Sequence, residues 1–190
     1  MPAVQSFICL IRGVNVGGNK LLKMDVLRAL CESIAGVTAA KTYLQSGNVV
    51  FRSGLDGGVL TKRIEDGIRK ATGFEAKVIL RTASEMRDVI AANPFTAGPQ
   101  RNPKALLVAF LGGAIGNEAR ALLSKLKIDS EELHFGDREL YLYLPEGIAG
   151  SKLSNALTEK KLGVNVTARN WNTVNALLEL AEKPSADDAE

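Results

Sequence analysis

Glycine, asparagine and basic residues are concentrated in one stretch near the start of the chain, LIRGVNVGGNK, which runs from Leu10 to Lys20. The stretch begins at the end of an apolar segment and continues with Arg12. Three glycines and two asparagines then precede Lys20. Glycine allows a backbone to approach a ligand closely, and backbone N–H groups beside cationic side chains bind phosphate or carboxylate. The stretch therefore predicts a loop that surrounds an anionic group.

Two other interpretations of this loop concern its spacing and its glycines. The stretch almost matches the nucleotide-binding pattern G-x-x-x-x-G-K-[ST], but Asn19 occupies the place of the lysine and no serine or threonine follows Lys20. That mismatch excludes a nucleoside-triphosphate loop of this kind. The remaining alternative is that the glycines and asparagines only form a tight left-handed turn between a strand and a helix, and bind nothing.

A second polar stretch, QSGN at residues 45–48, is expected to lie beside the first. Residues 37–45 and 48–53 are predicted strands joined by a short hairpin, and the expected topology brings that hairpin to the end of the first strand. The helix that begins near Met24 adds free N–H groups and a positive dipole end, where Lys20 and Lys23 are unfavourable unless an anion joins them. The residues predicted to bind a ligand at this edge are Arg12, Gly13, Asn15, Gly17, Gly18, Asn19, Lys20, Gln45, Ser46, Gly47 and Asn48.

A secondary candidate lies near the other end of the chain, in TARNWNTV at residues 167–174. Trp171 is able to stack on a base or ring, with Arg169 beside it. The alternative, which we favour, is that Trp171 opens an amphipathic helix and is buried in the core or at the domain interface, with Asn170 or Asn172 as the helix cap. The glycine-rich helix entry PEGIAGSK, residues 145–152, is a weaker anion candidate.

Hydrophobic periodicity predicts the order strand, helix, strand, strand, helix, strand in each half of the chain, with an added helix after each. In the first half, the strands are expected at 5–11, 37–45, 48–53 and 76–81, and the helices at 24–35, 60–72 and from Thr82, where Thr82 and Glu85 form a T-x-x-E capping box. In the second half, strands are expected at 104–111, 132–136, 139–144 and 164–169, and helices at 117–126, from Ser151 and from Trp171. Leu122, Leu123 and Leu126 are expected to point inward from the helix at 117–126.

The repeated order predicts an internal duplication of a βαββαβ unit. TKRIEDGIRKATG (61–73) and SKLSNALTEKKLG (151–163) share their first and last residue types, and each precedes a strand that ends in arginine. We therefore predict an α+β fold of two ferredoxin-like (α/β plait) units in tandem, each with an added helix. The expected boundaries are residues 1–94 for the first unit, 95–104 for a proline-rich linker, 105–182 for the second unit and 183–190 for a disordered tail.

Composition excludes several classes of protein. The chain of 190 residues is 46% hydrophobic, which suits a buried core, and it has no apolar run of the roughly 20 residues that a membrane span needs. We expect a cytoplasmic protein with no membrane partner. Residues 1–94 carry a net charge of +5 (13 Lys and Arg, 8 Asp and Glu), and residues 95–190 a net charge of −2 (11 and 13), so an anionic partner is favoured in the first half.

Residues for catalysis or metal binding are scarce. The two cysteines, Cys9 and Cys31, lie in apolar segments and are expected to be reduced core thiols. The single histidine, His134, leaves little material for a metal site or a Ser–His pair, and it is expected to be a packed strand residue. We therefore predict no catalytic residue, no metal site and no identifiable cofactor. Nothing in the sequence indicates an oligomeric state.

Several motifs resemble one family. LIRGVNVGGNK, TYLQSGNVVF (42–51), NPF (93–95), GSKLSNALTEKKLG (150–163) and TARNWNTV, in this order, are similar to the bacterial proteins of domain-of-unknown-function family 1697. The resemblance extends to about residue 180, and it implies two ferredoxin-like units. It implies no activity, because the family has no assigned substrate, cofactor or catalytic residue.

Three functions agree with these observations. The first is a non-enzymatic binding protein for a ligand that carries phosphate or carboxylate, with Arg12 as the charge partner and Asn15 and Ser46 as orienting groups. The second is binding of single-stranded RNA on an open sheet face, for which Phe51 is the one candidate stacking residue. The third is an enzyme that uses Ser46 and a general base from the second unit, such as Asp137 or Glu146.

Overall fold

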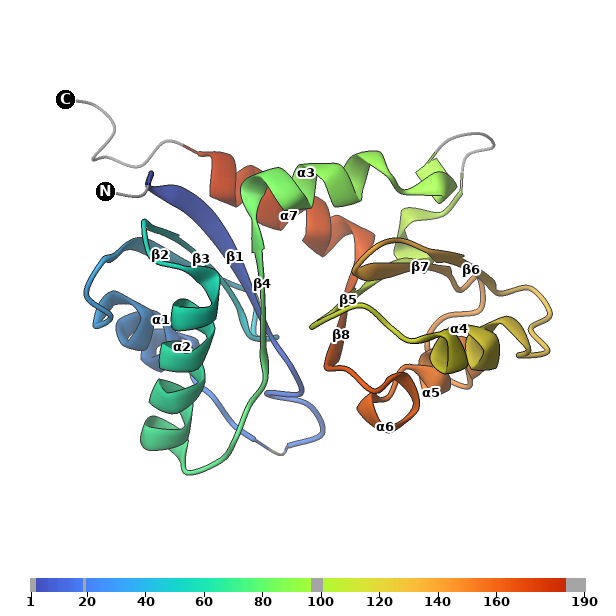
Figure 1. Cartoon of the computed structure of the whole chain (residues 1–190), viewed down its shortest axis with the longest axis horizontal. Helices are drawn as coiled ribbons and strands as arrows, with labels where there is room; N and C mark the ends of the chain where they lie inside the picture. The colour runs from blue at the N-terminus through green and yellow to red at the C-terminus, as the bar shows by residue number, and fades with distance from the viewer. Residues whose placement is uncertain (1–2, 19, 97–100, 184–190) are drawn as a thin grey trace. The chain divides into compact units, whose positions relative to one another are not determined.

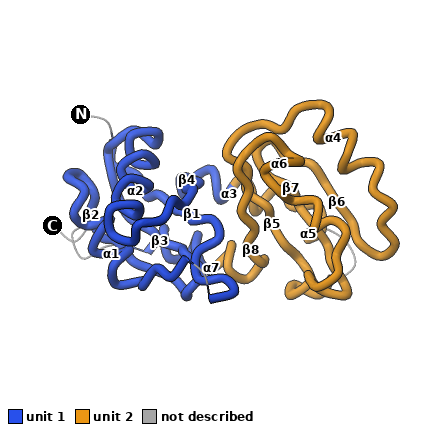
Figure 2. Tube along the Cα trace, turned by 90° about the horizontal axis from the view of Figure 1, so that it is seen from below, with its two compact units in different colours: residues 1–87, 176–190 blue, residues 88–175 orange. Residues whose placement is uncertain are grey.

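The computed structural model describes residues 3–18, 20–96 and 101–183. The chain forms two compact units, of which unit 1 comprises residues 1–87 and 176–190 and unit 2 comprises residues 88–175 (Figure 2). Each unit holds one four-stranded antiparallel sheet, and the described part of the chain has seven α-helices. The expected mixed α+β architecture of two sheet–helix units is therefore confirmed.

The sheet of unit 1 has the strand order β2-β3-β1-β4, with β1 and β3 as its central strands (Figure 1). Its strands are β1 (Gln5–Ile11), β2 (Val37–Tyr43), β3 (Asn48–Ser53) and β4 (Val78–Thr82). The helices α1 (Met24–Glu32) and α2 (Gly57–Thr72) follow β1 and β3 in the chain. The expected strands and helices of this half are all present, with boundaries that differ by a few residues.

Alternation along β1 builds the core of unit 1. Phe7, Cys9 and Ile11 lie on one face of the strand and share a buried cluster with Leu27 of α1 and Ile64 of α2. Successive side chains of a strand point to opposite faces, so one set of residues collects both helices against one face of the sheet. This packing fixes the end of β1, and with it the start of the glycine loop.

The predicted capping box at the start of α3 (Ala83–Ala91) is confirmed. The backbone N–H of Thr82 donates to Glu85 Oε2 at 2.8 Å, and the N–H of Glu85 donates to Thr82 Oγ1 at 3.1 Å. Two N–H groups that have no partner within the helix are satisfied in this way.

Unit 2 repeats the strand order of unit 1, as β6-β7-β5-β8. Its strands are β5 (Leu106–Leu111), β6 (Glu132–Phe135), β7 (Glu139–Tyr143) and β8 (Val166–Asn170). Its helices are α4 (Asn117–Ser124), α5 (Lys152–Ala156) and α6 (Glu159–Leu162), and α7 (Trp171–Glu182) begins in unit 2 and ends in unit 1. Leu107, Ala109 and Leu111 of β5 pack in one buried cluster with Leu123 of α4 and Leu153 of α5.

Three helix predictions for this half were wrong in detail. The single helix expected from Ser151 is divided into α5 and α6, because Leu157 has non-helical φ and ψ of −78° and 64° and the Thr158 side chain caps α6. Leu122, expected to point inward, is 39% exposed, whereas its neighbour Leu123 is buried. Trp171, expected to be buried, is only half-buried, and the buried positions of α7 include Val174 and Leu177 instead.

The segment predicted as a linker contributes contacts to unit 2 where it is described. Phe95 is buried, and the Arg101 guanidinium lies 5.1 Å from its ring centroid and 4.7 Å from that of Tyr143. Arg101 also pairs with Glu132, and the hydrogen bond raises the pKa of the arginine. Unit 2 comprises residues 88–175, whereas the second unit was expected to comprise residues 105–182 after a separate linker. Residues 97–100 of this segment, and residues 184–190 of the predicted tail, lie outside the described residues.

Cys31 of α1 gives a testable consequence of core packing. Burial, reinforced by the charge of Glu32, raises the pKa of its thiol from 9.0 to about 12. The thiolate is the reactive form of cysteine, so native Cys31 is expected to resist a disulfide reagent at pH 8 and to react within minutes once the protein is denatured. Labelling with and without denaturant, followed by peptide mass spectrometry, measures this; rapid labelling of Cys31 in the native protein would contradict it.

Candidate functional site

The end of β1 lies beside the hairpin between β2 and β3, as the sequence predicted. Leu10 pairs with Asn48 in the antiparallel register, and the N–H of Ile11 donates to the carbonyl of Gly47 at 2.8 Å. On the other side, the N–H of Arg12 donates to the carbonyl of Lys77, just before β4, at 2.9 Å. The start of the glycine loop is therefore held between two neighbouring segments of the same sheet (Figure 1).

Asn15 joins the glycine loop to the hairpin. Its amide Nδ2 donates to the carbonyls of Leu22 and Gln45, at 2.8 and 2.7 Å, and its Oδ1 accepts from the N–H of Leu22 at 2.8 Å. Its backbone has a φ of +58°, a left-handed conformation that asparagine adopts more readily than most residues. The Asn15 side chain is thus occupied in fixing the frame of the edge.

Gly47 is needed for close packing at this junction. Its φ is +70°, and a Cβ added there would lie 2.5 Å from Val14 Cγ2 and 3.0 Å from Ile11 Cβ. Real Cβ atoms do not approach other atoms so closely, so the hairpin reaches the end of β1 only with a glycine at this position. Asn48 is buried nearby, and its Nδ2 donates to the carbonyl of Tyr43 at 3.0 Å and to Ser46 Oγ at 2.9 Å.

The loop glycines have a different role. Gly13, Gly17 and Gly18 have φ values of +66°, +61° and +75°, and an added Cβ would meet nothing within 4 Å at any of them. All three are exposed. Their conformation requires glycine, or asparagine at some cost, but no packing does, so the space beside their backbone is open. Asn19, the remaining loop candidate, lies outside the described residues.

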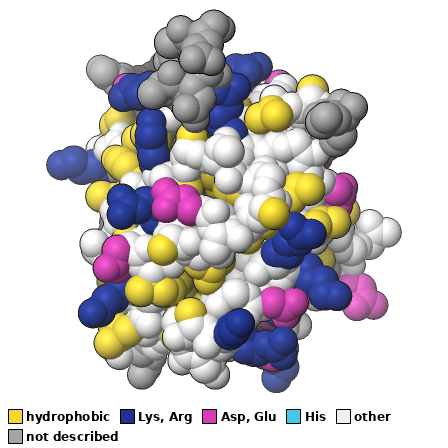
Figure 3. Space-filling view, turned by 90° about the vertical axis from the view of Figure 1, so that its left-hand side faces the viewer, with side chains coloured by type: hydrophobic (Ala, Val, Ile, Leu, Met, Phe, Trp, Pro, Cys, Tyr) yellow, Lys and Arg dark blue, Asp and Glu magenta, His cyan; other side chains and the backbone are white. Residues whose placement is uncertain are grey.

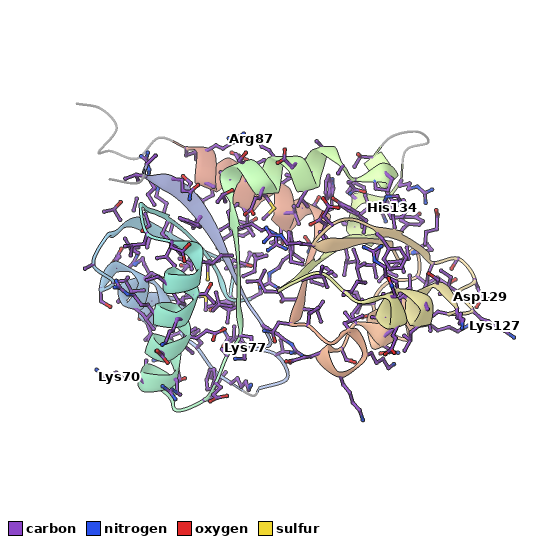
Figure 4. All side chains as sticks on the ribbon, in the orientation of Figure 1. Lys70, Lys77, Arg87, Lys127, Asp129 and His134 are labelled. Carbon is purple, nitrogen blue, oxygen red and sulfur yellow. The ribbon has the colours of Figure 1, made fainter. Side chains whose placement is uncertain are left out.

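Basic groups surround this open backbone. Lys20 is exposed, and its Nζ donates to the carbonyl of Glu75 at 3.0 Å and lies 5.9 Å from the ring centroid of Phe74. Lys23 occupies the N-cap position of α1 without capping the helix through its side chain. Arg12 is half-buried at the loop entry, and Lys77 projects at the same end of unit 1, where β4 begins (Figure 4). Arg12 and Lys20 thus lie within the loop and Lys23 follows it, whereas the Lys77 ammonium pairs with Glu65 of α2 at 3.7 Å.

Three exposed apolar side chains also lie at this edge, and the sequence did not indicate them. Val16, Leu21 and Leu44 are 68%, 70% and 56% exposed, which places them among the most exposed large hydrophobic side chains described. Each is adjacent in sequence to one of the residues that the Asn15 side chain joins, or to Asn15 itself. Their single positions in otherwise polar turns gave no periodic signal that would have revealed them.

The proposed RNA-stacking residue has no exposed ring. Phe51 is fully buried, and its ring is stacked on that of Phe7 with the centroids 5.8 Å apart. The Ser46 hydroxyl, the proposed nucleophile, is exposed and accepts the hydrogen bond from Asn48 described above. A bond from an amide donor does not activate a hydroxyl for attack, because activation requires a base that removes the proton.

The secondary candidates at residues 169–171 serve local structure. Arg169 is buried, and its Nη1 donates to Thr167 Oγ1 and to the carbonyl of Ala168, both at 2.8 Å. Asn170 Oδ1 accepts from the N–H of Thr173 at 2.8 Å, so the predicted helix cap is confirmed. Trp171 is half-buried and has its carbonyl bonded by Asn175 Nδ2 at 2.7 Å.

The weaker anion candidate, at residues 145–152, already has an anion from its own unit. The Glu131 carboxylate accepts from the N–H groups of Lys152 and Leu153, at 3.1 and 3.0 Å, at the start of α5. Glu131 and Lys152 line a cavity of about 260 Å³ together with Asp129 and Glu146. A cavity lined by three carboxylates repels a further anion.

His134 is exposed on β6, contrary to the packed position expected for it (Figure 4).

The described ranges contain neither a metal-binding cluster nor a helix suited to crossing a membrane. No group of three or more His, Cys, Asp or Glu side chains among residues 3–18, 20–96 and 101–183 has an arrangement that could hold a metal ion. None of the helices in these ranges has the length and apolar character that a membrane crossing requires.

The arrangement of strands and helices has a counterpart among solved structures. The conserved bacterial protein SP0830 from Streptococcus pneumoniae matches with a TM-score of 0.75 and 19% sequence identity, over 95% of this chain and 100% of that one. This likeness defines the class of the protein as a two-unit α+β fold. An unknown protein from Galdieria sulphuraria aligns with 14% identity over 88% of this chain and 99% of its own, at a TM-score of only 0.24.

The chain belongs to the family described as "Protein of unknown function (DUF1697)", which matches residues 4–141. The resemblance inferred from the motifs is thereby confirmed, although the matched residues end at 141 rather than near 180. The glycine loop and the QSGN hairpin both lie within the match, and the motifs at 150–163 and 167–174 lie beyond it. No curated protein matches the chain.

Proposed function

We propose that the protein is a non-enzymatic binding protein that holds a phosphate- or carboxylate-bearing ligand at the edge of unit 1 formed by residues 12–18, 20 and 45–48. The observation that carries this proposal is the open backbone at Gly13, Gly17 and Gly18, with nothing within 4 Å of the position of a Cβ, among Arg12 and Lys20. Cationic side chains beside exposed backbone N–H groups attract an anion.

The structure also changes the roles that we assign within this site. Asn15 and Asn48 make internal hydrogen bonds, so we assign them to the frame and not to the ligand. We assign the ligand contacts to the loop backbone, to Arg12 and to Lys20, whose ammonium carries three N–H donors and gives one of them to the Glu75 carbonyl. The N-terminus of α1 supports this assignment, because the Lys23 side chain at the N-cap accepts no N–H bond, and the side-chain acceptor given for the first turn is Asp25 Oδ1, which receives the N–H of Val26 at 2.9 Å.

We further infer that both units are ferredoxin-like. The order β2-β3-β1-β4 places the first and third strands at the centre, as an α/β plait does, and unit 2 has the same order. We assign the protein to the cytoplasm, an assignment supported by two buried cysteine thiols in a chain without a disulfide among its described residues.

Replacing Gly17 by asparagine tests the binding function directly. Asparagine tolerates the left-handed conformation at φ +61°, so the loop should keep its shape while the new side chain blocks close approach to the backbone. We expect binding of inorganic phosphate, followed by NMR titration, to weaken at least about tenfold, which is about 1.4 kcal/mol. Arg12→Ala should weaken it by a similar factor.

Gly73→Asn is the matched control. Gly73 has a φ of +78° at the C-cap of α2, also with nothing within 4 Å of an added Cβ. It should leave phosphate binding unchanged and cost a similar amount of stability. Equal phosphate affinity in the wild type, Gly17→Asn and Arg12→Ala would show that the loop is only a tight turn.

A further inference from the structure

The exposed apolar side chains at the glycine-loop edge extend the proposed function to a surface. Leu21 and Val16 are 70% and 68% exposed, and Leu44 is 56% exposed. Single exposed hydrophobic residues are ordinary, but a group of them marks an interaction site. The other large exposed hydrophobics are dispersed over unit 1 and unit 2, at Val4, Val26, Val59, Leu122 and Ile148.

Hydrogen bonds of Asn15 place these three side chains on adjoining turns. Val16 follows Asn15 directly, Leu21 precedes Leu22, and Leu44 precedes Gln45, and both Leu22 and Gln45 are bonded to the Asn15 amide. Consecutive Cα atoms are about 3.8 Å apart, so each apolar residue lies within one residue of the same side-chain junction. The three side chains therefore project from two turns that are fastened together.

The backbone of these turns is held in an uncommon conformation. Leu44, Asn15 and Lys20 have φ values of +54°, +58° and +49°. A left-handed leucine is unfavourable, and residues kept in such conformations cluster at functional sites. At Leu44 this conformation leaves an apolar side chain 56% exposed in the hairpin, where it adds nothing to the core.

Basic side chains accompany the apolar tips. Lys20 and Lys23 flank the segment that contains Leu21, and Arg12 lies at the loop entry, while Asp25 and Glu75 are the acidic residues nearest in sequence to this end. Figure 3 shows one face of the molecule, on which hydrophobic, basic and acidic side chains are dispersed among other atoms. The first 94 residues carry the net charge of +5 given by 13 basic and 8 acidic residues.

We infer that this edge docks on an anionic lipid bilayer, with Leu21, Leu44 and Val16 entering the headgroup boundary. The inference rests on the proposed function, because the lipid phosphate is then the anion held by the glycine loop. Apolar tips with lysines at their base are the arrangement that binds an interface, where the apolar groups are buried and the cations meet the phosphates. The sequence-based expectation of no membrane partner considered only a spanning helix, which such docking does not need.

A bilayer suits these residues better than a peptide does. Peptides are recognised in grooves or by addition to a strand edge. Three cavities of the described residues are lined by other side chains, and none of these three includes Val16, Leu21 or Leu44. Side chains that project from turns instead of lining a groove are matched by a soft surface into which they insert.

Flotation with lipid vesicles tests the inference. The wild type is expected to float with vesicles of phosphatidylglycerol and phosphatidylcholine, and to remain in solution with phosphatidylcholine alone. The double variant Leu21→Gln, Leu44→Asn should lower the floated fraction about tenfold, because it removes two apolar tips and the asparagine still tolerates the left-handed position. Ile148→Gln, which changes a side chain of unit 2 that is 55% exposed, is the matched control and should float like the wild type.

The outcomes separate this inference from the proposed function when the same variants are titrated with inorganic phosphate. Phosphate binding without flotation would overturn the inference and leave the proposed function standing. Flotation that depends on Leu21 and Leu44 without phosphate binding would support the docking surface and contradict the anion site. The inference would be overturned if the double variant floated like the wild type. It would also be overturned if the protein bound a soluble peptide of alternating glutamate and leucine and did not bind the vesicles.

Discussion

Replacing Gly47 by alanine is expected to destabilise unit 1 by about 3 kcal/mol, the sum of a left-handed alanine and an overpacked contact. The added Cβ would lie 2.5 Å from Val14 Cγ2 and 3.0 Å from Ile11 Cβ, and the φ of +70° is unfavourable for alanine in any case. Relief of the clash requires movement of the hairpin away from β1, which also strains the 2.8 Å bond from the Ile11 N–H to the Gly47 carbonyl. Hydrogen exchange of the Ile11 amide in the native protein measures the loss for this unit.

Gly73→Ala separates the clash from the backbone strain. Gly73 has a φ of +78° and no atom within 4 Å of an added Cβ, so only the strain of about 1 kcal/mol applies. The difference of about 2 kcal/mol between the two variants is the contribution of close packing at the hairpin. Equal losses for Gly47→Ala and Gly73→Ala would mean that the hairpin adapts and that close approach is not required.

Replacing Asn15 by aspartate is expected to cost about 3 kcal/mol, although the two side chains have nearly the same shape. The amide hydrogens that reach the carbonyls of Leu22 and Gln45, at 2.8 and 2.7 Å, are lost, and a carboxylate oxygen then faces two carbonyl oxygens. Oδ1 retains its bond from the Leu22 N–H, and aspartate tolerates the φ of +58°, so the cost isolates the two donated bonds. Urea unfolding, followed by a probe in unit 1, measures the change.

Asn102→Asp is the matched control for this substitution. The Asn102 side chain acts only as an acceptor at the start of a short 3₁₀ helix, where its Oδ1 receives the N–H of Lys104 at 3.1 Å. Aspartate performs that role as well, so the control should change stability by less than about 0.5 kcal/mol. A small loss at Asn15 as well would show that the loop and the hairpin hold together without the amide.

The two substitutions test the frame on which both proposals depend. Gly47 brings the hairpin to the end of β1, and Asn15 fastens the glycine loop to it. If the frame loosens, Gly17 and Leu44 lose their fixed positions even though neither has changed. Variants of the frame should therefore weaken phosphate binding and vesicle flotation together, whereas Gly17→Asn should affect the first more than the second.

The strands, the helices and the end of the sheet at which the loop lies are predictable from the sequence alone. Alternation in residues 5–11 and the helical spacing of Leu60, Ile64 and Ile68 are local signals, and packing in the core agrees with them. The capping box of Thr82 and Glu85 involves residues three apart, so it too was predictable. The shared edge followed from topology, because hairpins and crossover connections allow few arrangements of these strands.

The role of each residue at that edge depends on long-range contacts, which the sequence does not reveal. Nothing local distinguishes Asn15, which bonds to Gln45 across 30 positions, from an asparagine that faces a ligand. Gly47 and Gly17 are the same residue type in the sequence, but an added Cβ would contact Val14 at Gly47 and would meet nothing within 4 Å at Gly17. The exposure of Leu21 and Leu44 likewise depends on which distant side chains cover a turn, and such long-range contacts are set by the packing of the whole unit and not by the sequence of the turn.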